Sequence, residues 1–188
     1  MPVALMIFLF GKPTLVSFLV GLFIALIGEA IRIWGVGYAG VTTRKDCVDA
    51  PFLVTGGPFA IVRNPLYIGN AITGLGFVIM AAGAAGIVLN VTFLILWALC
   101  YFGVYGIIIP HEEEFLVQTF GEPYKEYCSK VNRLFPNFKK YPNPQGSFDP
   151  NAIIQAESRT LVQFAIFAVL MGLKILPAGI LVGKLFFS

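Results

Sequence analysis

The chain has 188 residues, of which 57% are hydrophobic and only 12% are charged. A soluble domain averages about 25% charged residues, so this composition excludes a water-soluble globular protein and indicates an integral membrane protein. The net charge of +3 is too small to indicate nucleic-acid binding, and Cys47, Cys100 and Cys128 lack the paired spacing of a disulfide or zinc framework.

Apolar runs, taken in chain order, predict an all-α membrane protein. A spanning helix needs about 20 apolar residues. Four runs meet this requirement, residues 14–37, 66–86, 87–109 and 160–187. We interpret the last run as one kinked helix. Residues 1–10 are apolar but too short to span alone, so they lie in the interface or dip into the membrane, which leaves four to five transmembrane helices. No cleavage-like site follows, and the whole chain, 1–188, is expected to form a single domain.

The distribution of charge predicts which ends of the helices face the cytoplasm. Residues 82–86 (AGAAG) form the turn of a predicted hairpin, so the flanking segments 38–65 and 110–159 lie on the same side. These segments hold nine of the thirteen Lys and Arg residues: Arg44, Lys45, Arg63, Lys125, Lys130, Arg133, Lys139, Lys140 and Arg159. The positive-inside rule places both segments in the cytoplasm, and we expect the chemistry of the protein there.

The segment 110–159 predicts two amphipathic helices in the C-terminal half of the chain. His111 to Glu114 (HEEE) place negative charge in the first turn of a helix, where the helix dipole favours it. Gly121 ends that helix and Pro123 suits the first turn of the next. The second helix has one apolar face, formed by Tyr124, Tyr127, Val131 and Leu134.

Three further polar features follow from residue order. Residues 141–150 are rich in Pro, Gly and Asn and predict a linker, and Asp149 is expected to cap the last helix. Glu29 and Arg32 are three residues apart within a span. Such residues are functional by default, but they can also pair with each other along the helix, and both interpretations stay open. Lys174 either snorkels or pairs with a carboxylate elsewhere.

The stretch 51–70 predicts an irregular backbone at the cytoplasmic end of a spanning helix. Gly56, Gly57 and Pro58 force a turn, and Asn64 precedes a proline, which disfavours the helical conformation. Irregular backbone at membrane depth is tolerated where protein buries it or where it lines a cavity. The alternative interpretation is a simple loop before a helix. Glu112 and Glu113 point to different faces of their helix, so at least one of them is expected to face a cavity, unless both are solvated.

Two stretches together resemble a known family. "LVTGGPFAIVRNPLYIG" is followed by a hairpin and then by "EEEFLVQTFGEPYKEYCSKVNRLFP". Their order and spacing, over residues 52–136, resemble the isoprenylcysteine carboxyl methyltransferase family, which is related to the membrane phospholipid N-methyltransferases. The C-terminal segment 160–187 is additional to this core.

The resemblance implies S-adenosylmethionine as methyl donor, bound between the cytoplasmic loop and the amphipathic helices. The donor-binding positions that it implies are Leu53, Val54, Phe59, Asn64, Pro65, Tyr67 and Glu112. Glu113 and Arg63 are expected at the reaction centre as catalytic residues. Arg133 either closes the pocket or is an exposed arginine at the membrane surface, and both interpretations stay open. No metal ion is implied.

Three positions depart from the family pattern. Phe59 replaces a tyrosine, Asn64 replaces a histidine, and Ile108 occupies a position where the prenylcysteine enzymes have a substrate-binding arginine. The implied reaction is methyl transfer to a lipophilic or lipidated acceptor at the membrane interface. A prenylcysteine-type carboxylate and a phospholipid amine both stay open as the acceptor. The alternatives are a catalytically degenerate lipid-binding protein of the same fold and a small transporter. The sequence leaves the oligomeric state open.

Overall fold

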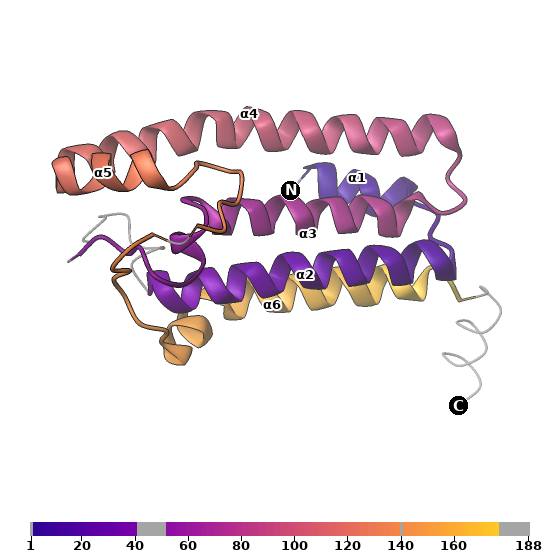
Figure 1. The fold of residues 1–188 in the computed structure, drawn as a ribbon. Coiled ribbons are helices and arrows are strands. Elements are labelled where there is room, and N and C mark those ends of the chain that lie inside the picture. The colour runs from indigo at the N-terminus through magenta and orange to yellow at the C-terminus, as the bar shows by residue number, and fades with distance from the viewer. Residues whose placement is uncertain (1, 41–51, 140, 177–188) are drawn as a thin grey trace.

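The computed structural model describes residues 2–40, 52–139 and 141–176, and all the regular structure within these ranges is helical. The elements are α1 (Pro2–Phe10), α2 (Leu15–Ala39), the 3-10 helix η2 (Gly57–Ala60), α3 (Pro65–Ala82), α4 (Ile87–Phe120), α5 (Glu122–Lys130) and α6 (Pro150–Leu173). Helices α2, α3, α4 and α6 are long and apolar enough to cross a membrane. The expectation of an all-α protein with four spanning helices is therefore confirmed (Figure 1).

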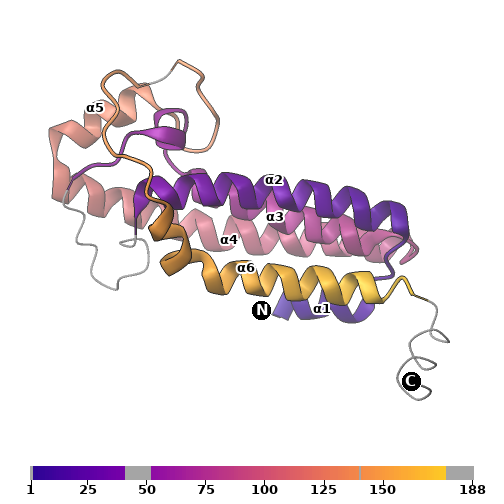
Figure 2. The same ribbon diagram turned by 90° about the horizontal axis from the view of Figure 1, so that it is seen from below.

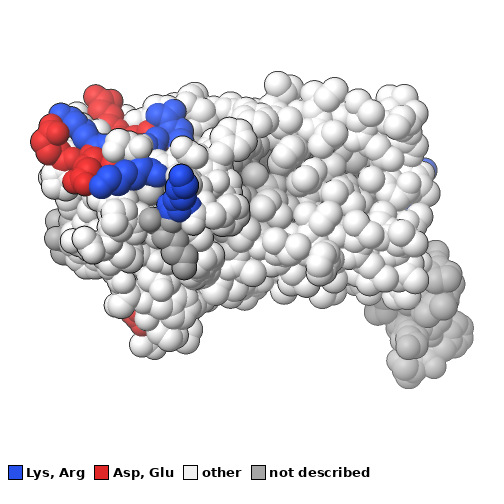
Figure 3. Space-filling view, in the orientation of Figure 1, with Lys and Arg blue, Asp and Glu red and all other residues white. Residues whose placement is uncertain are grey.

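The predicted hairpin between α3 and α4 is also confirmed, with its turn between Ala82 and Ile87. Gly83 has φ +25°, and a Cβ there would lie 2.3 Å from the carbonyl oxygen of Lys12. The turn is therefore packed against the segment before α2. Because of the hairpin, the end of α4 and the start of α3 lie at the same end of the molecule, and charged side chains gather over that end (Figure 3).

Helix α4 corrects one prediction. It runs for 34 residues through Pro110, so no new helix begins there, and His111 to Glu114 lie in a helix interior rather than in a first turn. A proline removes one backbone hydrogen bond of a helix. Here the long apolar run before Pro110 and the Glu-rich, helix-favouring run after it keep the helix continuous.

Helix α6 begins at Pro150, as the predicted cap requires, and continues without a break into the apolar run that begins at residue 160. The Asp149 carboxylate accepts a hydrogen bond of 2.9 Å from the Asn151 N–H. The predicted cap is thus confirmed. The second half of the predicted kinked span, from residue 177, lies outside the described residues. Lys174 contacts carbonyls rather than a carboxylate, since its Nζ donates to the carbonyl oxygen of Gly11, just after α1, at 2.6 Å and to that of Phe8 within α1.

The short helix α1 dips into the bundle. Figures 1 and 2 show its N-terminus part-way along the long helices, beside α3 and α4. Ile7 is buried there and packs in one apolar cluster with Met80 and Phe93. This packing agrees with the second of the two placements expected for residues 1–10, in which they dip into the membrane, and α1 is not among the helices long enough to span one.

Helices α2 and α3 approach each other more closely than any other pair. Glycines line their contact from both sides: Gly21 and Gly28 on α2, Gly69 and Gly76 on α3. A Cβ at Gly28 would lie 2.5 Å from the Thr73 backbone nitrogen. Small residues let membrane helices pack backbone to backbone in this way. In α4, by contrast, the described buried residues are Phe93, Ile109 and Glu113, so α4 packs less tightly against the rest.

We predict that Gly28→Ala destabilises the protein by about 1–3 kcal/mol, because the new methyl group forces two backbones apart. The measurement is the thermal unfolding midpoint in detergent. The control is Gly103→Ala on α4, where a Cβ meets no atom within 4 Å and where alanine favours the helix. Equal midpoints for the two variants would contradict this account of the α2–α3 contact.

Candidate functional site

The irregular loop of residues 52–64, called here the polar loop, is held by a distant segment. That segment, called here the strap, comprises residues 131–139 and 141–149. Backbone hydrogen bonds join the two: from the N–H groups of Thr55 and Gly56 to the Gln145 oxygen, from Arg63 to Asn132, from Asn137 to Ile61 and from Tyr141 to Ala60. The predicted linker at 141–150 is therefore an ordered part of the site, because its carbonyl and N–H groups satisfy those of the loop.

Helix α5 packs its aromatic side chains between the strap and the polar loop. Tyr124, Tyr127 and Val131 are buried together, as the predicted apolar face requires. Leu134 does not extend that face, because the backbone becomes extended at Val131 and α5 ends. The Tyr127 hydroxyl donates to the Phe59 oxygen at 2.7 Å. Burial raises the pKa of both tyrosines, so they are neutral phenols at neutral pH.

Glu113 is the charged centre of this region. It is 8% exposed and accepts from the Arg63 guanidinium at 3.1 Å and from Arg133 at 2.6 and 3.0 Å. The Asn64 amide also reaches it, at 3.4 Å, and donates to the Arg133 carbonyl at 3.1 Å. The structure thus brings Arg63, Asn64 and Glu113 together, and Arg133 closes over them.

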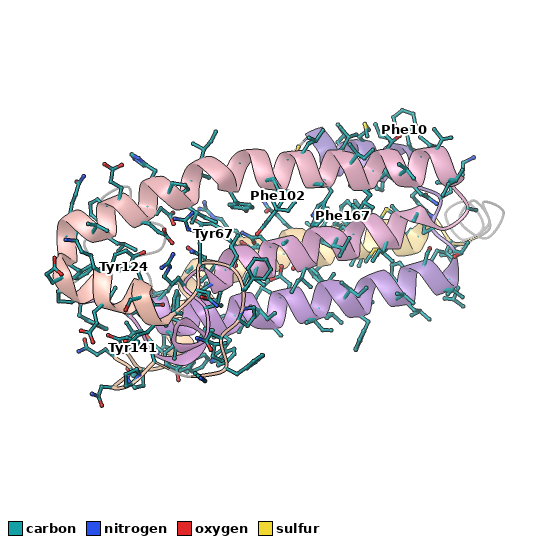
Figure 4. The ribbon with its side chains drawn as sticks, turned by 45° about the horizontal axis from the view of Figure 1, so that its top comes forward. Phe10, Tyr67, Phe102, Tyr124, Tyr141 and Phe167 are labelled. Carbon is teal, nitrogen blue, oxygen red and sulfur yellow. The ribbon has the colours of Figure 1, made fainter. Side chains whose placement is uncertain are left out.

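Glu112 lies on a different face of α4, as predicted. It is exposed, and its Oε1 accepts a hydrogen bond of 2.6 Å from the Tyr67 hydroxyl. The contact links the first turn of α3 to the C-terminal part of α4. Tyr67 and Glu112 therefore lie on the same side of the molecule, at the end that carries Tyr124 and Tyr141 (Figure 4).

A cavity of about 140 Å³, the loop cavity, lies beneath the polar loop. Its lining consists of Phe52, Leu53, Val54, Phe59, Arg63, Asn64, Leu116, Phe120, Tyr124 and Tyr127. Leu53, Val54, Phe59 and Asn64 were expected at such a site. Pro65, Tyr67 and Glu112 were also expected, but they lie outside this lining.

Sequence reasoning did not assign five of the lining residues to the site: Phe52, Leu116, Phe120, Tyr124 and Tyr127. Leu116 and Phe120 are four residues apart on α4, and Tyr124 and Tyr127 are three apart on α5, so the spacing could have shown that each pair shares a helix face.

A second cavity, the helix cavity, has a volume of about 280 Å³ and lies among α1, α3, α4 and α6. Apolar side chains form most of its wall, including those of Ile7, Phe77, Trp97 and Phe167. Its polar lining residues are Asn70, Tyr101 and Tyr105. The Tyr105 ring packs on the Tyr67 ring with centroids 4.6 Å apart, so this cavity reaches the Tyr67–Glu112 contact.

The ionisable pair inside α2 is part of a larger network. Arg32 lies 3.6 Å from Glu29, as the pairing interpretation expects, but its shorter ion pair, at 2.7 Å, is with Glu157 on α6. Arg32 also donates to Asn70 on α3. The partners on α3 and α6 come from distant parts of the chain, and for that reason the sequence did not indicate them.

Comparisons with known proteins agree with this architecture. A probable protein-S-isoprenylcysteine O-methyltransferase from Oryza sativa subsp. japonica is 34% identical over 121 residues, 62% of this chain and 60% of the relative. The protein-S-isoprenylcysteine O-methyltransferase of Schizosaccharomyces pombe is 35% identical over 102 residues, 54% of this chain and 40% of the relative. The cobalt-zinc-cadmium resistance protein CzcN of Cupriavidus metallidurans is 32% identical over 123 residues, 65% of this chain and 49% of the relative.

The chain therefore spans 60% or less of the length of these relatives. No solved structure matches it. The family model for phospholipid methyltransferases matches residues 16–123, which is more than half of the chain. The matched residues include α3, α4 and most of the residues that line the loop cavity. The chain belongs to the phospholipid methyltransferase family.

Proposed function

We propose that this protein transfers the methyl group of S-adenosylmethionine to a lipophilic acceptor at the cytoplasmic surface of a membrane. The observation that carries the proposal is that the loop cavity and the helix cavity both lie near the contact between Tyr67 and Glu112. The loop cavity lies at the charged end and contains Asn64, whereas the apolar helix cavity contains Tyr105, which packs on Tyr67. A water-soluble donor and a lipid-soluble acceptor need such neighbouring sites, because each must leave its own solvent to react.

The residues of the loop cavity fit the donor. Its adenine ring is flat and aromatic, and the rings of Phe59, Phe120 and Tyr124 offer flat apolar surfaces. The cavity also contains Arg63, whose buried Nε has no hydrogen-bond partner among the described residues. An anionic or carbonyl group of a ligand would satisfy that N–H. Leu53 also lines a wider polar hollow of about 520 Å³ beside α5, which gives room for the rest of the donor.

When bound, the donor would supply a sulfonium methyl group: as the acceptor atom bonds to the methyl carbon, the carbon–sulfur bond would break and S-adenosylhomocysteine would leave. The protein's own residues hold the reactants and exclude water. The exposed Glu112 carboxylate, oriented by Tyr67, offers negative charge near a cationic donor. Aromatic faces favour a cation as well.

Glu113 and Arg63 act in this proposal mainly by shaping the site. The Glu113 carboxylate already accepts from two guanidinium groups, so it is poorly suited to act as a base. Its ion pairs instead connect the polar loop, α4 and the strap. A carboxylate acceptor needs no general base for methyl transfer, whereas an amine must first lose a proton. This difference favours an acid over an amine as the acceptor.

The direct test is transfer of radiolabelled methyl groups from S-adenosylmethionine to a membrane lipid extract by the purified protein. We expect label in the organic phase and, by mass spectrometry, an acceptor that is heavier by about 14 Da, the mass of one CH₂ group. Donor binding without any transfer would favour the degenerate lipid-binding protein. A folded protein that binds neither the donor nor its demethylated product would contradict the proposal.

Removal of one aromatic side chain from the lining of the loop cavity tests whether the donor binds there. We expect Phe59→Ala to weaken the binding of S-adenosylhomocysteine, measured by isothermal titration, by about 10-fold, because base–aromatic stacking contributes about 1–3 kcal/mol. The matched control is Phe138→Ala in the strap, which removes a ring that is 83% exposed and lies outside the cavity lining. The same loss in both variants would rule out this location for the donor.

Neutralisation of Glu113 tests its structural role. We predict that Glu113→Gln destabilises the protein by about 3 kcal/mol, because it leaves the buried Arg63 guanidinium without its counter-charge. Glu114→Gln is the control, since Glu114 is exposed and is not a lining residue of the loop cavity. Thermal unfolding in detergent provides the comparison. A Glu113→Gln protein as stable as the control would show that the ion pairs contribute nothing to the fold.

A further inference from the structure

The polar end of the helix cavity contains a hydrogen-bond chain with a fixed direction. It starts at Arg32 on α2, passes through Asn70 on α3 and ends at Tyr105 on α4. Asn70 and Tyr105 line the cavity, and Arg32 lies behind them. The cavity is otherwise largely apolar, so these groups are positioned to recognise the one polar part of a lipid that enters it.

The chemistry of arginine sets the direction. A guanidinium can only donate hydrogen bonds, so the Asn70 side-chain oxygen must face Arg32. The Asn70 amide nitrogen therefore faces Tyr105 and donates to its hydroxyl oxygen at 2.9 Å. The Tyr105 oxygen is an acceptor in this contact, and among the described residues no hydrogen bond uses the Tyr105 proton as donor.

Arg32, the first residue of this series of hydrogen bonds, is held in place by ion pairs. The Arg32 side chain is 12% exposed and forms a 2.7 Å ion pair with Glu157, whose side chain is 4% exposed. Glu29 lies 3.6 Å away on the same helix. With both carboxylates beside it, Arg32 has little freedom to turn, and a charged donor at the start of this partly buried series of hydrogen bonds polarises the groups that follow. The Tyr105 hydroxyl is thereby made a stronger donor.

We propose that the Tyr105 hydroxyl donates a hydrogen bond to an oxygen atom, a carboxylate or carbonyl, in the head of the lipid acceptor whose chain occupies the helix cavity. Asn70 and Arg32 are positioning residues that keep the Tyr105 proton available. The inference rests on the proposed function for the identity of the ligand as acceptor. It deepens that function, because it requires an oxygen acceptor in the head of the lipid, which a carboxylate supplies and a protonated amino group by itself does not.

The location suits this role. Tyr105 packs on Tyr67, and Tyr67 donates to Glu112, so an oxygen bound by Tyr105 lies beside the residues assigned to the donor. The chain has an apolar residue, Ile108, where a substrate-binding arginine was expected from the resemblance. A neutral phenol, polarised by a buried arginine one helix away, supplies recognition of the oxygen in its place.

Binding rather than turnover tests the inference. The probes are S-farnesyl-N-acetylcysteine, which has a carboxylate, and ethyl farnesyl thioether, which has no oxygen. Their affinities for the full-length protein in detergent are measured by isothermal titration. For Tyr105→Phe we expect about 3- to 10-fold weaker binding of the acid, the usual range for one lost hydrogen bond, and unchanged binding of the thioether. Equal weakening of both probes, or no weakening of either, would overturn the proposal.

The donor-to-acceptor direction of the hydrogen bonds from Arg32 through Asn70 to Tyr105 allows a second test. In Asn70→Asp the new carboxylate accepts from Tyr105, so the Tyr105 proton is no longer available to the ligand. This variant should lose affinity for the acid as Tyr105→Phe does, and the double variant should lose no more than either single variant. Additive losses would overturn the positioning role. Thermal unfolding of each variant separates loss of fold from loss of recognition.

The outcomes also distinguish this inference from the proposed function. If the wild-type protein binds neither probe, the helix cavity is not an acceptor site and the inference fails. If it binds the acid through Tyr105 but transfers no methyl group, the inference holds for a lipid ligand and the proposed enzymatic activity fails.

Discussion

The charged end of the molecule depends on the ion pairs that the buried Glu113 carboxylate forms with Arg63 and Arg133. Its two arginine partners, Arg63 and Arg133, come from the polar loop and from the strap and are 70 residues apart in sequence. A buried charge is costly unless it is paired and hydrogen-bonded. The requirement to neutralise Glu113 therefore draws the loop, the end of α4 and the strap together, and the loop cavity is the space that they enclose.

The membrane-spanning helices differ in how closely they pack against one another. Glycines let α2 and α3 meet backbone to backbone, whereas α4 carries large aromatic side chains toward α3, including those of Trp97, Tyr101 and Tyr105. Large side chains hold helices further apart, and the short helix α1 fills only part of the remaining space. The helix cavity follows from this mismatch between a tight helix pair and a looser neighbour.

The two cavities approach each other where α3 begins. Asn64 lies before its first turn, Tyr67 within that turn, and Asn70 one turn further on, so a few residues face the polar loop, Glu112 and the helix cavity in succession. The short spacing of these residues at one end of α3 thus places the loop cavity and the helix cavity close to each other. The proline at the start of α3 keeps the preceding backbone out of the helix and available to the loop.

Much of the fold could be predicted from the sequence, because apolar length and charge act locally. The four spans, the hairpin turn at Gly83 and the cap at Asp149 were all recognisable from a few neighbouring residues. The continuity of α4 through Pro110 was not, since a proline ends or interrupts a helix according to the turns around it. Likewise, the linker composition of 141–150 gave no sign that its backbone bonds to the polar loop.

The candidate site divides in the same way. The sequence by itself determined that Asn64, Tyr67, Glu112 and Glu113 belong to polar stretches at one membrane face, because residue order and charge fix that placement. Only the tertiary structure decided that Glu113 is neutralised by Arg63 and Arg133, and that Arg32, Asn70 and Tyr105 form one chain. These contacts join different helices, and their partners depend on how the helices pack, which no local pattern of residues encodes.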